Sequence, residues 1–262
     1  RFKDLDEMMA FSPLEQADFT GWNVVVDQDF SSEEIIYKKY RQQFPAEWTK
    51  APEGSSVYTS FYNSMFMWPM LVFGYENFMI MSFTDGLDRI MAEFAVINRR
   101  VFRAFARLPV NFVVSHDDIV LPTGPVCSPE WMHKYIFPRY EEFWGIVKAA
   151  GKEVIFMVDG CVDAYADDVM ACGARGITSE PFTDYKRLAR KYENCFIAGE
   201  GDCRVLMRND KAEIKKMVES MVETANMSGG YVMICGKYIP CHVLAYAIKY
   251  YFDICAEMGY RN

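Results

Sequence analysis

The second half of the chain alternates short apolar runs with amphipathic segments, and this alternation limits the fold more than any other feature. The apolar runs lie at residues 110–115, 153–158, 176–179, 195–198 and 231–234. Helices are predicted after them, at 128–150, 162–172, 182–192, 209–227 and 243–258. The first of these begins with Ser128 as N-cap and Pro129 at its first position. Strands that are apolar on both faces and alternate with helices predict a parallel sheet covered by helices.

The predicted fold class is α/β, with a closed (β/α)8 TIM barrel as the leading solution and a doubly wound open sheet as the second. In the first half, residues 57–62 read as a strand and 69–83 and 87–108 as helices, while 23–27 is a further candidate strand. Six strands are clear and residues 23–27 could form a seventh. An eight-stranded barrel would therefore lack its N-terminal strand. We expect one domain over residues 1–262, with 1–56 as an irregular cover and 57–262 as the barrel core.

Composition excludes several classes of protein. A hydrophobic fraction of 51% with 24% charged residues indicates a folded core. The net charge of -8 argues against nucleic acid as a partner. No apolar stretch reaches the roughly 20 residues that a membrane span needs, and no signal peptide is recognised. The eight cysteines include no CxxC pair, so reduced thiols in a cytoplasmic protein are expected. The sequence does not decide the oligomeric state, and a homodimer is one possibility.

Polar residues follow the predicted strands, at the end where barrel enzymes place their active sites. This rim consists of Asn63, His116, Asp117, Asp118, Met157, Asp159, Cys161, Glu180, Glu200, Asp202, Cys203 and Cys235. Carboxylates and thiols with almost no basic residue suit a divalent metal better than a phosphate.

Several rim residues have a structural interpretation beside the functional one. Asp117 and Asp118 either act as site acids or cap the loop after their strand. His116 and His133 fit structural or surface positions better than ligand positions, and His242 is the better candidate to line the site. Aromatic side chains such as Tyr62, Trp68 and Tyr238 either fill the core or stack on a substrate.

From about residue 57 to 260 the chain resembles the uroporphyrinogen decarboxylase superfamily. The resemblance is carried by Asp117-Asp118, Ser128-Pro129-Glu130, Phe137-Pro138-Arg139-Tyr140, the turn at 199–202 and Gly229-Gly230-Tyr231. It implies a TIM barrel and one of two chemistries, decarboxylation of uroporphyrinogen or zinc-assisted methyl transfer to or from a corrinoid protein. The chain shows no arginine-rich N-terminal motif, and an acidic rim would repel an octacarboxylate. The methyltransferase branch is therefore expected.

The metal ligands implied by this resemblance depart from one known pattern. Thiol-directed corrinoid methyltransferases carry His-x-Cys-Gly after one strand and Cys-Gly after the last. Residues 157–160 read Met-Val-Asp-Gly here, whereas Cys235-Gly236 is kept. The resemblance thus implies a zinc site of Asp159 and Cys235 with Glu180 or Cys203. A carboxylate-rich zinc site is a stronger Lewis acid and suits the polarisation of an ether oxygen.

The resulting hypothesis is anaerobic O-demethylation of a small methylated substrate, with an aryl methyl ether as the first choice. The methyl group passes to the cobalt of a separate corrinoid protein, and Asp117 or Asp118 positions the substrate. The substrate-binding candidates are Tyr62, Asn63, Met157, Glu200, Tyr238 and His242. Asp167, Cys195 and Cys235 resemble a zinc pattern proposed for aryl-ether O-demethylases, but they are not expected to converge. The alternatives are corrinoid-to-thiol methyl transfer, a decarboxylase-like enzyme, and a non-catalytic binder of a tetrapyrrole or corrinoid protein.

Overall fold

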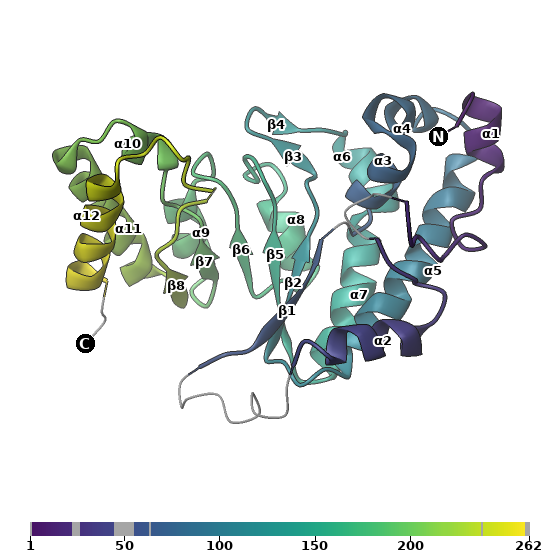
Figure 1. The fold of residues 1–262 in the computed structure, drawn as a ribbon, viewed down its shortest axis with the longest axis horizontal. Coiled ribbons are helices and arrows are strands. Elements are labelled where there is room, and N and C mark those ends of the chain that lie inside the picture. Colours follow the sequence, from purple (N-terminus) through teal and green to yellow (C-terminus); the bar gives the residue numbers. More distant parts are fainter. Residues whose placement is uncertain (1, 23–26, 45–54, 63, 237, 260–262) are drawn as a thin grey trace. The chain divides into compact units, whose positions relative to one another are not determined.

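The computed structural model describes residues 2–22, 27–44, 55–62, 64–236 and 238–259 (Figure 1). Its larger sheet holds six parallel strands in the order β1-β2-β5-β6-β7-β8. Their bounds are Tyr58–Tyr62, Phe112–His116, Glu153–Met157, Gly176–Thr178, Phe196–Ala198 and Gly230–Val232. The α/β class and the six clear strands are confirmed. Most of the further candidate strand, residues 23–26, lies outside the described residues.

The chain forms two compact units, and strand β5 begins in the first and ends in the second. The first unit contains β1, β2 and seven helices in the part of the chain that the structure describes. These helices are α1 (Leu5–Ala10), α2 (Glu33–Arg41), α3 (Met67–Phe73), α4 (Tyr75–Met81), α5 (Leu87–Ala106), α6 (Pro129–Tyr135) and α7 (Phe137–Ala149). Helix α5 packs against α2 and α7. The predicted cap is confirmed, because the Ser128 hydroxyl accepts the Trp131 N–H at the start of α6.

An aromatic core holds the first unit together. Trp68 is fully buried and its ring lies 4.6 Å from that of Phe30, 5.6 Å from Phe61 and 5.7 Å from Phe94. Full burial of each such side chain stabilises a fold by about 1.5–3 kcal/mol. Because Phe30 and Phe19 come from the N-terminal segment, residues 1–56 contribute to this core and are more than a cover over it.

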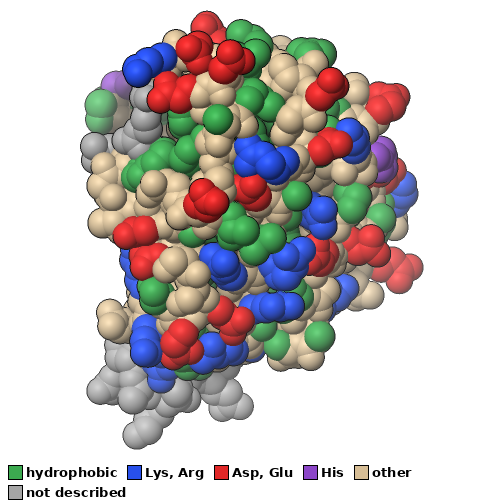
Figure 2. Space-filling view, turned by 90° about the vertical axis from the view of Figure 1, so that its right-hand side faces the viewer, with side chains coloured by type: hydrophobic (Ala, Val, Ile, Leu, Met, Phe, Trp, Pro, Cys, Tyr) green, Lys and Arg blue, Asp and Glu red, His purple; other side chains and the backbone are tan. Residues whose placement is uncertain are grey.

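Charged side chains on the helical side of the first unit are largely paired. Figure 2 shows Lys and Arg side chains gathered mainly below the middle of the view, interspersed with Asp and Glu. Arg107 bonds both Glu33 and Glu34, and Arg99 pairs with Glu142. Exposed pairs of this kind contribute only about 0–1 kcal/mol each. This face therefore provides solubility more than stability.

Two helices that the sequence predicts as continuous are each broken in the first unit. The helix predicted at 69–83 is split into α3 and α4 by Gly74, whose φ of +89° ends the first segment. The helix predicted at 128–150 is split into α6 and α7 at Ile136. Pro138 follows this break at the start of α7, where its missing N–H costs nothing.

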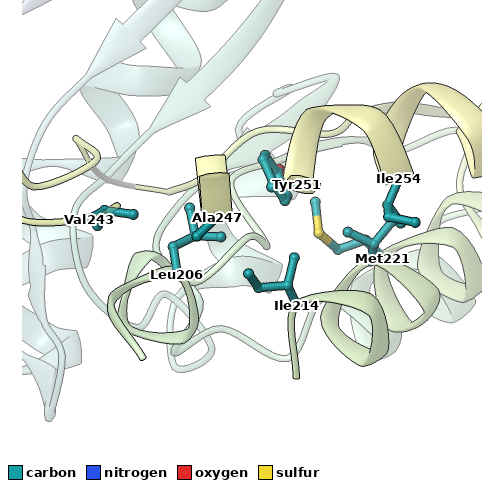
Figure 3. Packing of buried hydrophobic residues seen from close by; sticks show 8 residues of the cluster. Leu206, Ile214, Met221, Val243, Ala247, Tyr251 and Ile254 are labelled. Carbon is teal, nitrogen blue, oxygen red and sulfur yellow. The ribbon is translucent and has the colours of Figure 1, made fainter. Parts of the chain in front are cut away.

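The second unit contains the rest of β5, strands β6, β7 and β8, and five described helices. The helices are α8 (Ala166–Ala171), α9 (Tyr185–Lys191), α10 (Cys203–Met207), α11 (Lys211–Met227) and α12 (Ala245–Met258). Figure 3 shows Leu206, Ile214, Met221 and Tyr251 packed between α10, α11 and α12. Helix α10 and the hairpin of β3 (Val120–Leu121) and β4 (Gly124–Pro125) were not predicted.

Helices α8 and α9 are shorter than the sequence predicts. Asp184 caps α9 by accepting the Arg187 N–H, so that helix begins three residues later than expected. Throughout the described residues, none of the helices combines the length and the apolar character that a membrane crossing requires.

Candidate active site

A tyrosine, a histidine and an aspartate meet at the carboxyl ends of β1 and β2. The two strands pair in parallel with Tyr62 opposite His116, and their ring centroids lie 4.3 Å apart in an edge-on arrangement. The His116 Nε2 lies 3.0 Å from Asp118 Oδ1. His116 and Asp118 meet because alternate residues of an extended chain project to the same side. His116 retains 13% and Asp118 21% side-chain exposure, so both are within reach of a ligand.

Asp117, between these two residues, faces the opposite way and is fully buried. Its carboxylate accepts the Phe66 N–H at 2.8 Å, the Met67 N–H at 2.7 Å and the Tyr140 hydroxyl at 2.8 Å. These N–H groups open α3, whose own N-cap residue supplies no side-chain acceptor. Asp117 therefore caps α3 from a distant part of the chain.

Burial determines the charge of Asp117. Removal from water raises the pKa of this carboxyl to about 6. The three hydrogen bonds act in the opposite direction and lower the pKa, but their effect is smaller than that of burial. The two acids that the sequence predicts as catalytic thus have different surroundings. Asp117 has three protein donors and no exposure, whereas Asp118 contacts the partly exposed imidazole of His116.

In the second unit, the loops after β7 and β8 are joined by their backbones. The Gly201 N–H donates to the Ile234 carbonyl at 3.1 Å, and the Gly236 N–H donates to the Gly201 carbonyl at 2.9 Å. Gly199 has a φ of +95°, and a Cβ there would lie 2.0 Å from the Ser179 carbonyl oxygen. Glycines are needed here because the strand-end loops approach each other so closely.

Glu200, predicted to bind substrate, is engaged within the second unit. Its Oε2 accepts the Tyr231 hydroxyl at 2.6 Å and its Oε1 accepts the Thr224 hydroxyl at 2.9 Å. Burial raises the pKa of Glu200, and these two hydrogen bonds oppose that effect. The carboxylate therefore ties β8 to helix α11.

The predicted zinc ligands of the second unit do not assemble into one group. Among the described residues, no three of Asp159, Glu180, Cys203 and Cys235 bring ligand atoms within 4.8 Å of one another. Burial raises the pKa of the metal-free Cys235 thiol to about 11. The Asp202 carboxylate accepts three hydrogen bonds from the Arg204 guanidinium, at 2.8, 2.9 and 3.0 Å.

The remaining predicted residues lie apart from any such group. Tyr238 is 96% exposed, His242 is exposed, and Met157 is partly buried at the end of β5. Asn63 lies outside the described residues.

The rival zinc set is not brought together either. Asp167 on α8 pairs with Lys191 and Arg187, and Cys195 is buried just before β7 begins. With Cys235, they form no metal-binding group in the described parts of the chain.

The contact between His116 and Asp118 was not predicted from the sequence. Its signal was available in the sequence, because a histidine two residues before an aspartate at a strand end places both side chains on one face. The division of labour between Asp117 and Asp118 was not visible there, because it depends on where the first turn of α3 lies in space.

A parallel α/β sheet with polar side chains after its strands is the arrangement of α/β barrel proteins. A model of the uroporphyrinogen decarboxylase family matches residues 58–258, and the chain belongs to this family. Among the solved structures that match is a methyltransferase from Methanosarcina mazei, with a TM-score of 0.64 and 14% identity. The alignment covers 94% of this chain and 69% of that chain, and at this identity the likeness concerns the fold. No protein with a curated description matches the chain.

Proposed function

We propose that the chain is a methyltransferase that moves a methyl group from a methylated substrate, an aryl methyl ether, to the cobalt of a separate corrinoid protein. The observation that carries the proposal is the hydrogen-bonded His116–Asp118 pair beside Tyr62 at the ends of β1 and β2. Membership of the uroporphyrinogen decarboxylase family supports it, and so does the shared fold with a protein named as a methyltransferase.

Each of the three residues has a chemical role in this proposal. The Tyr62 ring offers an aromatic surface for an aryl substrate. The His116 Nε2 and the Asp118 Oδ1 lie 3.0 Å apart, so one metal ion or one proton can be shared between the imidazole and the carboxylate. Asp117 acts as a positioning residue, because it holds the first turn of α3 next to this strand end.

The donor chemistry of this pair fits a zinc ion. Histidine nitrogen and carboxylate oxygen are both zinc ligands, and a catalytic zinc takes three protein ligands and keeps one open position. The proposal assigns two of them to His116 and Asp118, and it keeps Asp159, a zinc ligand expected from the sequence, as the candidate for the third. When bound, zinc would act as a Lewis acid toward the ether oxygen of the substrate.

Metal analysis of anaerobically purified protein tests the ligand assignment. We expect about one zinc per chain in the parent protein and in Cys235→Ala, and loss of the metal in His116→Ala. His133→Ala is the matched control, because His133 is an exposed histidine on helix α6. Zinc lost from Cys235→Ala but kept in His116→Ala would move the site to the thiols. Absence of zinc from the parent protein would contradict zinc assistance.

A further inference from the structure

We propose that a cavity at the outer edge of β1 is a second binding site, for a small aromatic carboxylate. The cavity has a volume of about 580 Å³ and lies between strand β1, helix α2 and the segment at residues 27–28, all within the first unit. Ligand-binding cavities commonly measure about 300–1,000 Å³. The proposal needs neither the metal nor the methyl transfer proposed above.

The strongest pointer to a ligand is the amide of Gln28, which lines the cavity. Gln28 is only 6% exposed, and its Nε2 has no hydrogen-bond partner in the described part of the chain. A buried donor left without an acceptor costs about 1–3 kcal/mol. Native folds leave few such groups, and an unsatisfied one calls for an explanation. An acceptor oxygen of a bound carboxylate would satisfy it.

Lys39 gives the cavity a positive charge, and among the described residues that line the cavity it is the one lysine or arginine. In the described part of the chain its Nζ pairs with no carboxylate, and its one hydrogen bond, to the Asp27 carbonyl, measures 3.5 Å. Asp27 also lines the cavity, but its Oδ1 already accepts the Gly21 N–H at 2.6 Å. The Asp27 carboxylate keeps its negative charge, so an anion would bind on the side of Lys39, whose ammonium forms no ion pair with any described carboxylate.

Tyrosines give the cavity its aromatic character. Tyr58 is 54% exposed and stacks on Phe112 with centroids 5.1 Å apart and ring planes 11° from parallel. Tyr40 forms another part of the lining, and burial raises the pKa of its hydroxyl to about 12, so it stays a donor at neutral pH. Aromatic walls with several donors and one unpaired cation favour a planar ring bearing a carboxylate over an aliphatic or cationic ligand.

Strand β1 comes first in the sheet order, so no strand among the described residues pairs with its outer edge. Its other edge is occupied, since Tyr58–Tyr62 pairs residue by residue with Phe112–His116. Side chains along β1 alternate, so the exposed Tyr58 and Ser60 share one face while Thr59 and Phe61 are buried. The ligand would thus lie against a strand that is already held by its pairing with β2 and by its buried side chains.

Calorimetric titration with benzoate tests the site, with benzamide as the neutral analogue. We expect benzoate to bind the parent protein, benzamide to bind at least about tenfold more weakly, and Lys39→Met to remove that difference. Lys38→Met is the matched control, since Lys38 neighbours Lys39 but points to Glu34 at 3.9 Å and does not line the cavity. Gln28→Leu should weaken benzoate binding while raising the melting temperature, because the orphaned amide is removed.

Three results would overturn the proposal. The first is no benzoate binding to the parent protein, and the second is equal binding of benzoate and benzamide. The third is an equal loss of binding in Lys38→Met and Lys39→Met. Because none of these measurements involves zinc or a corrinoid, their failure leaves the methyltransferase proposal unaffected.

Discussion

Replacing Asp117 by alanine should destabilise the first unit strongly, because one carboxylate serves three buried donors. The Phe66 and Met67 N–H groups and the Tyr140 hydroxyl would lose their acceptor. A buried donor left unpaired costs about 1 kcal/mol or more, so Asp117→Ala should lower the free energy of unfolding by about 3 kcal/mol or more at neutral pH. Chemical denaturation followed by far-UV circular dichroism measures this loss. Asp118→Ala is the neighbouring control and should cost about 1 kcal/mol or less.

The pH dependence of stability provides a sharper test of the same residue. The pKa of Asp117 is raised to about 6 in the fold from an unfolded value near 3.8. The folded state therefore binds the extra proton between these values, and the contribution of Asp117 to stability is full below the lower pKa and lost as the pH rises through the upper one. The loss amounts to about 1.4 kcal/mol between about pH 5 and about pH 7.5.

The expected result is that the parent protein and Asp117→Ala differ more in unfolding free energy at the lower pH than at the higher one. A difference that is independent of pH would refute the argument that burial controls this carboxyl. A variant as stable as the parent protein at both pH values would refute the capping role as well.

Two further predictions concern the second unit. Gly199→Ala should cost several times more stability than the control Gly21→Ala in thermal denaturation. Both glycines have a positive φ, but only Gly199 has a backbone atom 2.0 Å from the added Cβ. Equal costs would contradict the tight approach of the strand-end loops. Met221→Ala, at a fully buried position between α11 and α12, should lower the free energy of unfolding by about 2–5 kcal/mol. Met207→Ala, at a 39% exposed position, should cost far less, and a reversed order in denaturant titrations would contradict the packing in Figure 3.

The strands were predictable because each is an apolar run that ends in polar residues, a pattern that depends only on local sequence. The breaks at Gly74 and Ile136 were harder to see, since the apolar periodicity continues across them. Gly74 was a usable signal, because glycine is the residue that most often ends a helix with a positive φ.

The candidate site was only partly predictable from the sequence. The position of polar residues after strands followed from the fold class, but their surroundings did not. Asp117 is buried because α3 begins beside it, and Glu200 is engaged because Thr224 and Tyr231 lie within hydrogen-bond distance. Such long-range partners leave no trace in the spacing of residues along the chain.

The central claim is methyl transfer, and a spectroscopic assay tests it most directly. The purified chain is mixed anaerobically with a methoxylated aromatic compound and a corrinoid protein whose cobalt is reduced, and the absorbance change on cobalt methylation is followed. The account predicts methylation that requires the chain, is lost in His116→Ala and is retained in the His133→Ala control, both of them folded by circular dichroism. Undiminished methylation by folded His116→Ala would contradict the role of the His116–Asp118 pair, and no methylation with any methoxylated substrate tested would contradict the proposed function.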